Sequence, residues 1–239
     1  MTMDLRGRTA LVTGGTRGLG LAIARKLCAS GCDVYVNYAR SEADAARAVA
    51  ELAGLPGVAT LLRGDARRPE ALLAGLDRLD VYVHNISSFH PAPDGLPTLP
   101  DLRADLAMAV EPLLGAVLPL RDLMAGGLGR VIAVSSVGAR RVVPAYANLG
   151  VAKAALESLV RYLAVELAGQ GIAVNAVSTS KLDKGGDGAA ERMLASRTPA
   201  GRLSTPADVA DVVALLCADE AAWIHGQVIT ADGGLGLRA

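Results

Sequence analysis

A glycine-rich segment lies between a short apolar run at 9–13 and a stretch with helical periodicity at 19–30. Glycine allows a tight turn and a close approach of the backbone to a ligand, and a helix that begins after such a turn directs unpaired N–H groups at a phosphate. A strand, a glycine turn and a helix in this order predict a dinucleotide-binding turn. The residues expected to bind the dinucleotide here are Gly14, Thr16, Arg17, Gly18, Leu19 and Gly20.

Apolar runs typical of strands alternate with helical stretches along the rest of the chain. The pattern predicts an α/β protein with a doubly wound parallel sheet of about seven strands, a Rossmann fold. With 239 residues and 51% hydrophobic content, we expect one domain, 1–239. Irregular segments at 87–100, with four prolines, and 178–198, with three glycines, follow strand ends, and we interpret both as substrate loops, the second as a mobile lid. The expected strands are 9–13, 33–37, 58–63, 80–84, 130–134, 173–177 and 227–230, and the expected helices are 19–30, 42–53, 70–76, 101–124, 147–168 and 207–217.

Composition excludes several classes of function. Basic and acidic residues balance at 24 each without a basic block, so we do not expect a nucleic-acid partner. An uninterrupted apolar run of 18 or more residues is missing from the sequence, so we expect no membrane insertion. Three cysteines are too few for a disulfide framework and lack metal-ligand spacing, which favours a cytoplasmic protein without a metal site.

The residues after the second expected strand favour NADPH as the cofactor. A carboxylate there would bind the ribose hydroxyls of NADH, whereas arginine accommodates a 2′-phosphate. The sequence places Arg40 and Ser41 at this point, with Arg17 in the glycine turn, and no carboxylate at the strand end. After the third strand, Asp65 and the adjacent Ala66 are expected at the adenine, and Asn85 at the end of the fourth strand is expected beside the nucleoside.

Ser136, Tyr146 and Lys153 are the candidate catalytic residues. A tyrosine can protonate a developing oxyanion, a lysine can hold the cofactor ribose and favour ionisation of the phenol, and a serine can orient a substrate oxygen. Six residues separate Tyr146 from Lys153. On one helix this spacing would place the phenol roughly 4.5 Å further toward the N-terminus than a three-residue gap would. The wider spacing favours conjugate reduction of an enoyl thioester, in which charge collects on an oxygen distant from the carbon that accepts hydride.

Together, these motifs and the segment 174–177 resemble the short-chain dehydrogenase/reductase superfamily over about residues 5–237. Within it, the chain is similar to the NADPH-dependent enoyl-[acyl-carrier-protein] reductase III, on the Tyr–Lys spacing and on segments 37–41, 150–157, 161–167 and 198–202. The resemblance implies that NADPH reduces the β-carbon of a trans-2-enoyl thioester. It assigns the enolate oxygen to Tyr146 and the nicotinamide ribose to Lys153. It also implies a homo-oligomer, a tetramer or dimer, built on helices 101–124 and 147–168.

Two departures from the family pattern indicate a specialised paralogue, for example in secondary metabolism. Ile86 follows Asn85 where relatives have alanine, and Glu111 stands where relatives often keep a relay asparagine. We expect an enoyl substrate carried on acyl-carrier protein or coenzyme A. A carbonyl reductase of a polyketide or other pathway intermediate is the alternative, and a non-catalytic NADPH-binding protein is a third interpretation.

Overall fold

The structure, a computed structural model, describes residues 3–183, 185–186 and 188–237, and their strands form one seven-stranded sheet. The strands are β1 (Thr9–Val12), β2 (Asp33–Tyr38), β3 (Ala59–Arg63), β4 (Val81–His84), β5 (Gly129–Ser136), β6 (Ile172–Thr179) and β7 (Val228–Ala231). They lie in the order β3-β2-β1-β4-β5-β6-β7, and all neighbours pair in parallel. The strand order reverses between β1 and β4, where ligands bind in doubly wound sheets. The predicted Rossmann fold is confirmed.

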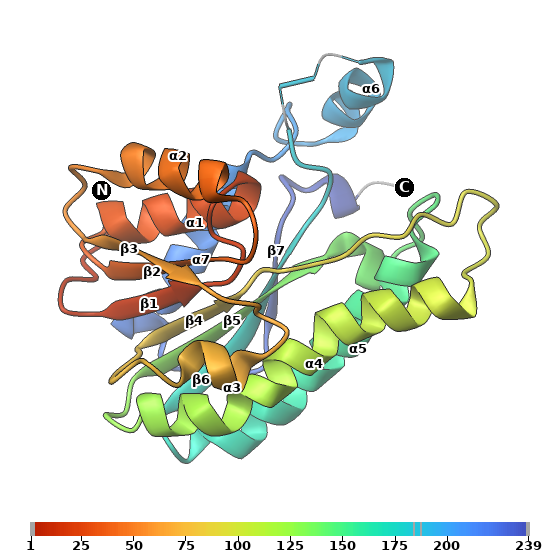
Figure 1. Ribbon diagram of the computed structural model, residues 1–239. Coiled ribbons are helices and arrows are strands. Elements are labelled where there is room, and N and C mark those ends of the chain that lie inside the picture. The colour runs from red at the N-terminus through yellow and green to blue at the C-terminus, as the bar shows by residue number, and fades with distance from the viewer. Residues whose placement is uncertain (1–2, 184, 187, 238–239) are drawn as a thin grey trace.

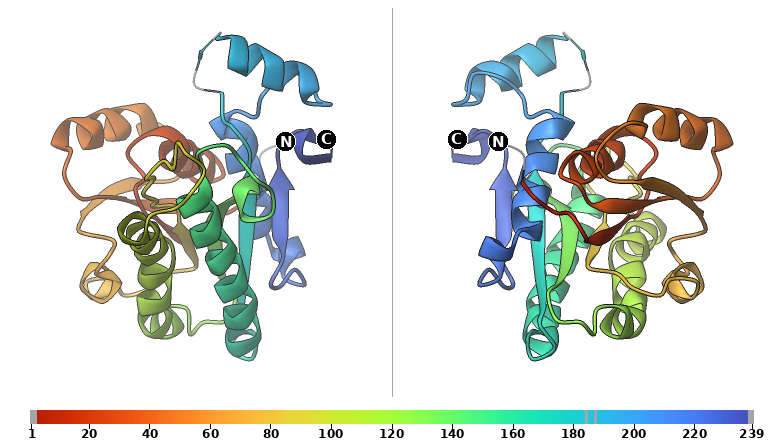
Figure 2. Two further views of the ribbon diagram at one scale, coloured as in Figure 1. Left: turned by 90° about the vertical axis from the view of Figure 1, so that its right-hand side faces the viewer. Right: turned by 90° about the vertical axis from the view of Figure 1, so that its left-hand side faces the viewer.

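Helices cover both faces of the sheet (Figures 1 and 2). They are α1 (Gly18–Ala29), α2 (Glu42–Leu52), α3 (Pro69–Leu73), α4 (Leu99–Leu123), α5 (Ala147–Ala168), α6 (Ala189–Arg197) and α7 (Pro206–Cys217). One apolar cluster joins α1, α2 and α7 to the sheet, and a second joins α3, α4 and α5 to its other face. Among the described residues, no helix is both long enough and apolar enough to cross a membrane.

The central strands are buried on both faces, and their side chains alternate between the two clusters. In β4, Val81 and Val83 pack toward α1 and α7, whereas Tyr82 packs toward α4 and α5. The same alternation directs His84 toward α4, where its Nε2–H donates to the carbonyl oxygen of Ala109 at 2.9 Å. The end of β4 is thereby tied to α4, directly beside the expected nucleotide site.

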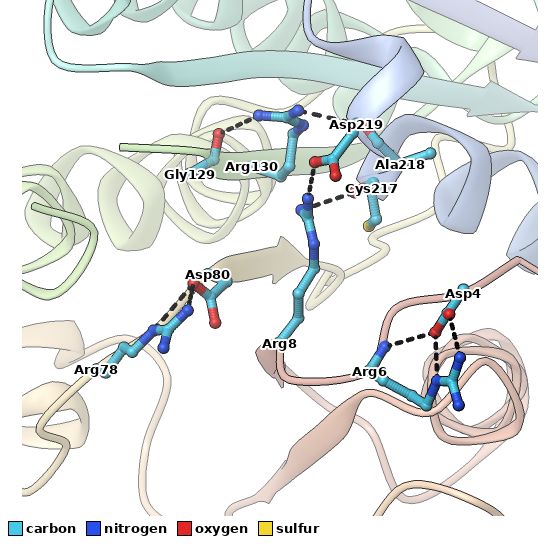
Figure 3. Close-up of polar contacts among 10 residues, drawn as sticks. All are labelled: Asp4, Arg6, Arg8, Arg78, Asp80, Gly129, Arg130, Cys217, Ala218 and Asp219. Atoms are coloured by element: carbon cyan, nitrogen blue, oxygen red, sulfur yellow. Dashed lines mark hydrogen bonds and ion pairs between the residues drawn. The ribbon is translucent and has the colours of Figure 1, made fainter. Parts of the chain in front are cut away.

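Charged side chains tie together the amino ends of the strands, opposite the expected site (Figure 3). Arg8, just before β1, bonds to the Cys217 carbonyl and to Asp219 after α7. Arg130, at the start of β5, is 2% exposed and donates to the carbonyl oxygen of Ala218 at 3.2 Å. Asp80 accepts from Arg78 before β4. These contacts link the amino ends of β1, β4 and β5 to one another and to the residues after α7, whereas the expected site lies at the carboxyl edge, which is lined by two adjoining cavities.

The segment 178–198 differs from the irregular loop that the sequence predicted. β6 continues to Thr179, and α6 occupies 189–197; Lys184 and Asp187 lie outside the described residues. The prediction of loop structure was wrong here because α6 has no buried residue, so its sequence carries no apolar stripe. Figure 1 shows α6 projecting from the body of the molecule. The segment 87–100 is irregular up to Thr98, which caps α4.

Candidate active site

A cavity of about 820 Å³ lies along the carboxyl ends of β1, β2, β3 and β4. Most residues predicted to bind the dinucleotide line it: Gly14, Arg17, Gly18, Leu19, Gly20, Arg40, Asp65, Ala66 and Asn85. Thr16 and Ser41 are not among its lining residues. Thr16 is buried, and the Ser41 hydroxyl accepts the Asp44 N–H at 3.2 Å as the N-cap of α2. Dinucleotide contacts of these two residues, like those of the residues that line the cavity, stay predictions.

Two asparagines hold the glycine turn against the neighbouring strands. The Asn37 Oδ1 accepts the Gly14 N–H at 3.2 Å, and its Nδ2 donates to the carbonyl oxygen of Gly64 at 3.0 Å. The Asn85 Nδ2 donates to the carbonyl oxygen of Thr13 at 2.9 Å. The side chains of Asn37 and Asn85 therefore connect the turn to the ends of β2 and β4 and to the residue after β3.

The cradle for a pyrophosphate depends on two glycines of this turn. Gly14 has φ +61°, a left-handed conformation that favours glycine. A Cβ on Gly20 would lie 2.2 Å from the Gly14 carbonyl oxygen and 2.7 Å from the Asn85 Nδ2. A side chain at position 20 would therefore displace the turn from the end of β4.

Two arginines line the cavity near the start of α2, as the sequence predicted. The side chain of Arg17 is 83% exposed, and its Nη1 lies 4.0 Å from the Asp44 Oδ2. Arg40 is also exposed. The sequence analysis did not consider two carboxylates in the first turn of α2. Asp44 pairs with Arg17, and Glu42 pairs with Arg63 at 3.1 Å. Neither carboxylate lines the cavity, whereas Arg17 and Arg40 do, so the side-chain charge at this end of the cavity is positive.

Asp65 lines the same cavity, and its carboxylate accepts hydrogen bonds from Arg67. Hydrogen bonds from the Arg67 side chain, the shortest at 2.6 Å, lower the pKa of Asp65 to about 2. An adenine amino group would have to share this carboxylate with Arg67.

A second cavity, of about 380 Å³, brings together the three predicted catalytic residues, Ser136, Tyr146 and Lys153. It adjoins the first cavity, because both are lined by Leu19, Asn85, Ser87 and Leu182. The predicted dinucleotide site and the predicted catalytic residues are therefore continuous at the carboxyl ends of β4 and β5. The described residues include no group of three or more His, Cys, Asp or Glu side chains suited to hold a metal ion.

Tyr146 lies one residue before α5, as its N-cap, with φ −112° and ψ 9°. The helical geometry assumed from the sequence therefore applies to Lys153 and not to Tyr146, and the preceding turn sets the position of the phenol. Burial raises the pKa of Tyr146 above its usual value, although hydrogen bonding with Ser136 opposes the shift. The phenol stays protonated at neutral pH and can donate a proton.

Gly138 permits the position of the tyrosine ring, a role that sequence reasoning missed. A Cβ on Gly138 would lie 2.6 Å from both Cδ1 and Cε1 of Tyr146. The neighbouring Gly150 of α5 has a similar role, because its Cβ would lie 2.8 Å from the Gly138 carbonyl oxygen. The sequence feature that could have indicated this role is the pair of glycines, Gly138 and Gly150, on either side of Tyr146.

Lys153 is 4% exposed and donates to the carbonyl oxygen of Val134 at 2.8 Å. Burial lowers the pKa of Lys153 to about 8, and the negative charge of Asp105 opposes this shift. The ammonium form predominates at neutral pH and becomes a minority species above pH about 8.

We expect kcat/KM for the reduced dinucleotide to fall as pH rises through about 8, because Lys153 loses its charge. The pH dependence of kcat/KM reports groups of the free enzyme, so initial rates at low dinucleotide concentration measure it. In Lys153→Arg, whose side chain stays charged, the fall in kcat/KM should occur at higher pH. A profile that stays level up to about pH 10, the ordinary value for lysine, would contradict the assignment.

Two residues noted for departing from the family pattern lie in different surroundings. Ile86 lines the dinucleotide cavity, and its Cγ2 would lie 3.2 Å from a Cβ on Gly14. Glu111 is exposed on α4. A buried acid on the same helix, Asp105, was missed by sequence reasoning. Its burial could have been inferred from the sequence, because Asp105 lies four residues before Ala109 and therefore on the same, buried face of α4.

Comparison with known proteins places this site in a family. A family model described as enoyl-(acyl carrier protein) reductase matches residues 14–236. A 1-cyclohexenylcarbonyl-CoA reductase of Streptomyces collinus is 37% identical, over 98% of this chain and 89% of its own length. The chain belongs to the short-chain dehydrogenase/reductase family. The protein is thus an oxidoreductase of a family that uses NAD or NADP.

The solved structures of two reductases are also similar to this chain. The promiscuous reductase LugOII, which catalyses keto-reduction at C1 during lugdunomycin biosynthesis, has a TM-score of 0.89 and 33% identity over 98% of this chain and 99% of its own. The angucycline C-6 ketoreductase LanV, solved with bound NADP, has a TM-score of 0.88 and 30% identity over 99% of this chain and 98% of its own.

The residues of this short-chain reductase fit a nicotinamide dinucleotide. The cradle at Gly14 and Gly20 leaves room that a Cβ would fill. At the other end, the Ser180 hydroxyl lines the catalytic cavity, is buried and has no hydrogen-bond partner among the described residues. A buried polar atom without a partner is costly, and a polar ligand group can satisfy it.

Proposed function

We propose that the protein is an NADPH-dependent reductase of an enoyl thioester, with the acyl group carried on coenzyme A or acyl-carrier protein. The observation that carries the proposal is that Tyr146 and Lys153 line one cavity, which adjoins the dinucleotide cavity. The family model described as enoyl-(acyl carrier protein) reductase and the similarity to the 1-cyclohexenylcarbonyl-CoA reductase of Streptomyces collinus support an enoyl thioester as the substrate.

Each catalytic side chain has a distinct role in this proposal. The bound dinucleotide supplies the hydride. Tyr146, protonated at neutral pH, donates its proton to the thioester carbonyl oxygen as negative charge collects there. The Lys153 ammonium stabilises the resulting phenolate and binds the ribose, and Ser136 orients the phenol by hydrogen bonding.

Arg17 and Arg40 support NADPH over NADH as the cofactor, because guanidinium groups bind phosphate in a charge-assisted, bidentate manner. We expect the double substitution Arg17→Ser and Arg40→Ser to weaken NADPH binding by about 10- to 100-fold and to leave NADH binding almost unchanged. Titration of cofactor fluorescence measures both dissociation constants. Arg25→Ser, which removes an exposed arginine of α1 that does not line the cavity, is the matched control. Equal weakening for both cofactors would contradict the assignment.

Reduction of a ketone is the second candidate, favoured by the similarity to LugOII and LanV. An NADPH-oxidation assay with crotonyl-CoA and acetoacetyl-CoA separates the two, because the substrates match in chain length and carrier. We expect turnover of the enoyl thioester. Turnover of the keto thioester alone would favour the second candidate.

Further features support finer predictions about this reductase. All seven strands share one sheet, which supports a single domain over 1–239. We propose that the substrate contacts the loop 87–100 and the segment 178–198, which contains the end of β6 and α6. Exposed apolar side chains on α4 and α5 support a homo-oligomer built on these helices: Leu106, Leu114, Leu118, Val151, Tyr162 and Val165.

A further inference from the structure

The loop after β4 is fastened to three other parts of the site. The Ser88 hydroxyl donates to Oδ1 of Asp105 in α4 at 2.7 Å. The His90 carbonyl oxygen accepts from the Asn148 Nδ2 in α5 at 2.9 Å. The Ala92 N–H donates at 2.9 Å to the carbonyl oxygen of Ala145, the residue before Tyr146. We call the residues 88–92 the clasp loop.

Asp105 is the anchor of the clasp loop and is 0% exposed. Besides the Ser88 hydroxyl, it accepts the backbone N–H of His90 at 3.2 Å and the His90 Nδ1–H at 2.7 Å. All three donors belong to the clasp loop. A buried carboxylate is costly unless such donors compensate it, so loss of these contacts would favour a rearrangement of the loop.

The clasp loop also touches the proposed proton donor. The ring of Phe89, between the two anchored residues Ser88 and His90, lies 5.5 Å from the Tyr146 ring, centroid to centroid, at an interplanar angle of 36°. Aromatic pairs of this geometry attract each other. Gly138 lies close to the same tyrosine ring. The ring of Tyr146 is therefore held by Gly138 and by Phe89, and the position of Phe89 depends on Asp105.

The charge of Asp105 reaches the catalytic pair as well. It raises the pKa of Tyr146 and opposes the lowering of the Lys153 pKa by burial. The pKa of His90 is raised, chiefly by its hydrogen bond to Asp105 and further by the charge of Asp101 on the same helix. His84 of β4 stays neutral because burial lowers its pKa to about 3. On the loop side, Asp105 thus faces the His90 imidazole, whose Nδ1 lies 2.7 Å from its Oδ1.

We propose that Asp105 and His90 are positioning residues for the reaction: they fasten the clasp loop to α4, so that Phe89 holds the phenol of Tyr146. The proposal rests on the proposed role of Tyr146 in reduction. Its test therefore includes two measurements that need neither substrate nor turnover.

The first measurement is hydrogen exchange of the clasp-loop amides of His90 and Ala92 in the intact protein. His90→Ala removes the imidazole donor, and we expect faster exchange at both amides. His90→Asn places an amide N–H near the position of Nδ1 and should restore slow exchange. His225→Asn, a histidine that bonds locally to the Ala222 carbonyl, is the control and should change neither amide. Unchanged exchange in His90→Ala would overturn the fastening role.

The second measurement is the pKa of Lys153 by NMR of ¹³C-labelled lysine side chains, which is practical because the chain has only four lysines. In Asp105→Asn the favourable charge is lost, so the pKa should fall below its wild-type value of about 8. Asp80→Asn removes a carboxylate at the opposite edge of the sheet (Figure 3) and should leave the value unchanged. An equal pKa in the wild type and in Asp105→Asn would contradict the placement of a charged Asp105 next to the catalytic cavity.

Activity completes the test. His90→Ala should lower kcat by about 10- to 100-fold through misplacement of the phenol, with the dissociation constant of NADPH unchanged, and His90→Asn should recover most of kcat. A loss of NADPH binding equal to the loss of kcat, or no recovery in His90→Asn, would indicate a merely structural role and contradict the proposal. If the exchange and NMR results hold while neither thioester is reduced by the wild type, the positioning pair stands and the proposed substrate class fails.

Discussion

Replacing Tyr146 by phenylalanine should lower kcat by about 100- to 10,000-fold while the dissociation constant of NADPH stays unchanged. The substitution removes one hydroxyl and keeps the ring that packs between Phe89 and Gly138. The variant loses the hydroxyl that donates the proton in the proposed mechanism, whereas Ser136 and Lys153 stay in the cavity. Stopped-flow NADPH oxidation with crotonyl-CoA and fluorescence titration measure the two quantities.

Tyr162→Phe is the matched control for this variant. Tyr162 also belongs to the α5 region, but it is 72% exposed and lies outside the catalytic cavity. Its kcat should equal that of the wild type. Retention of more than about a tenth of kcat in Tyr146→Phe would be too small an effect for loss of a general acid and would remove Tyr146 from the mechanism.

Gly20→Val should abolish dinucleotide binding and lower the free energy of unfolding by about 1 to 3 kcal/mol or more. The first atom of the new side chain would lie 2.2 Å from the Gly14 carbonyl oxygen, so the turn must move. That movement breaks the fit of the turn to Asn85 and closes the pyrophosphate cradle. Cofactor fluorescence and urea unfolding measure the two effects.

Gly169→Ala provides the control, because Gly169 at the end of α5 has φ −64° and no atom within 4 Å of a built Cβ. It should bind NADPH as the wild type does. Wild-type affinity for NADPH in Gly20→Val would show that the pyrophosphate binds elsewhere and would contradict the cavity assignment.

Most of the fold could be predicted because buried parallel strands are nearly continuous apolar runs, as in 130–134 and 173–177. Helix α6 could not, because it buries no residue and its sequence has no apolar face to detect. Helix α3 ends at Leu73 and not at position 76, a boundary that local pattern does not define well.

The grouping of the three candidate catalytic residues in one cavity could be predicted, because Ser136, Tyr146 and Lys153 lie within one segment that runs from the end of β5 into α5. The pair of His90 and Asp105 could not, because their contact depends on the path of an irregular loop that returns to α4. The role of Gly138 could not be predicted either, because it depends on the Tyr146 ring that packs against it. Functional residues that are close together in the sequence could therefore be grouped from the sequence alone. Contacts that depend on the path of a loop could be found only in the structure.

Deuterium transfer tests the central claim most directly. NADPH labelled with deuterium at the transferable position is incubated with the enzyme and an enoyl-CoA, and the product is analysed by NMR. The account predicts deuterium on the β-carbon of a saturated thioester. Transfer only to a carbinol carbon when a keto thioester is offered, with no label in any product of the enoyl-CoA, would contradict it.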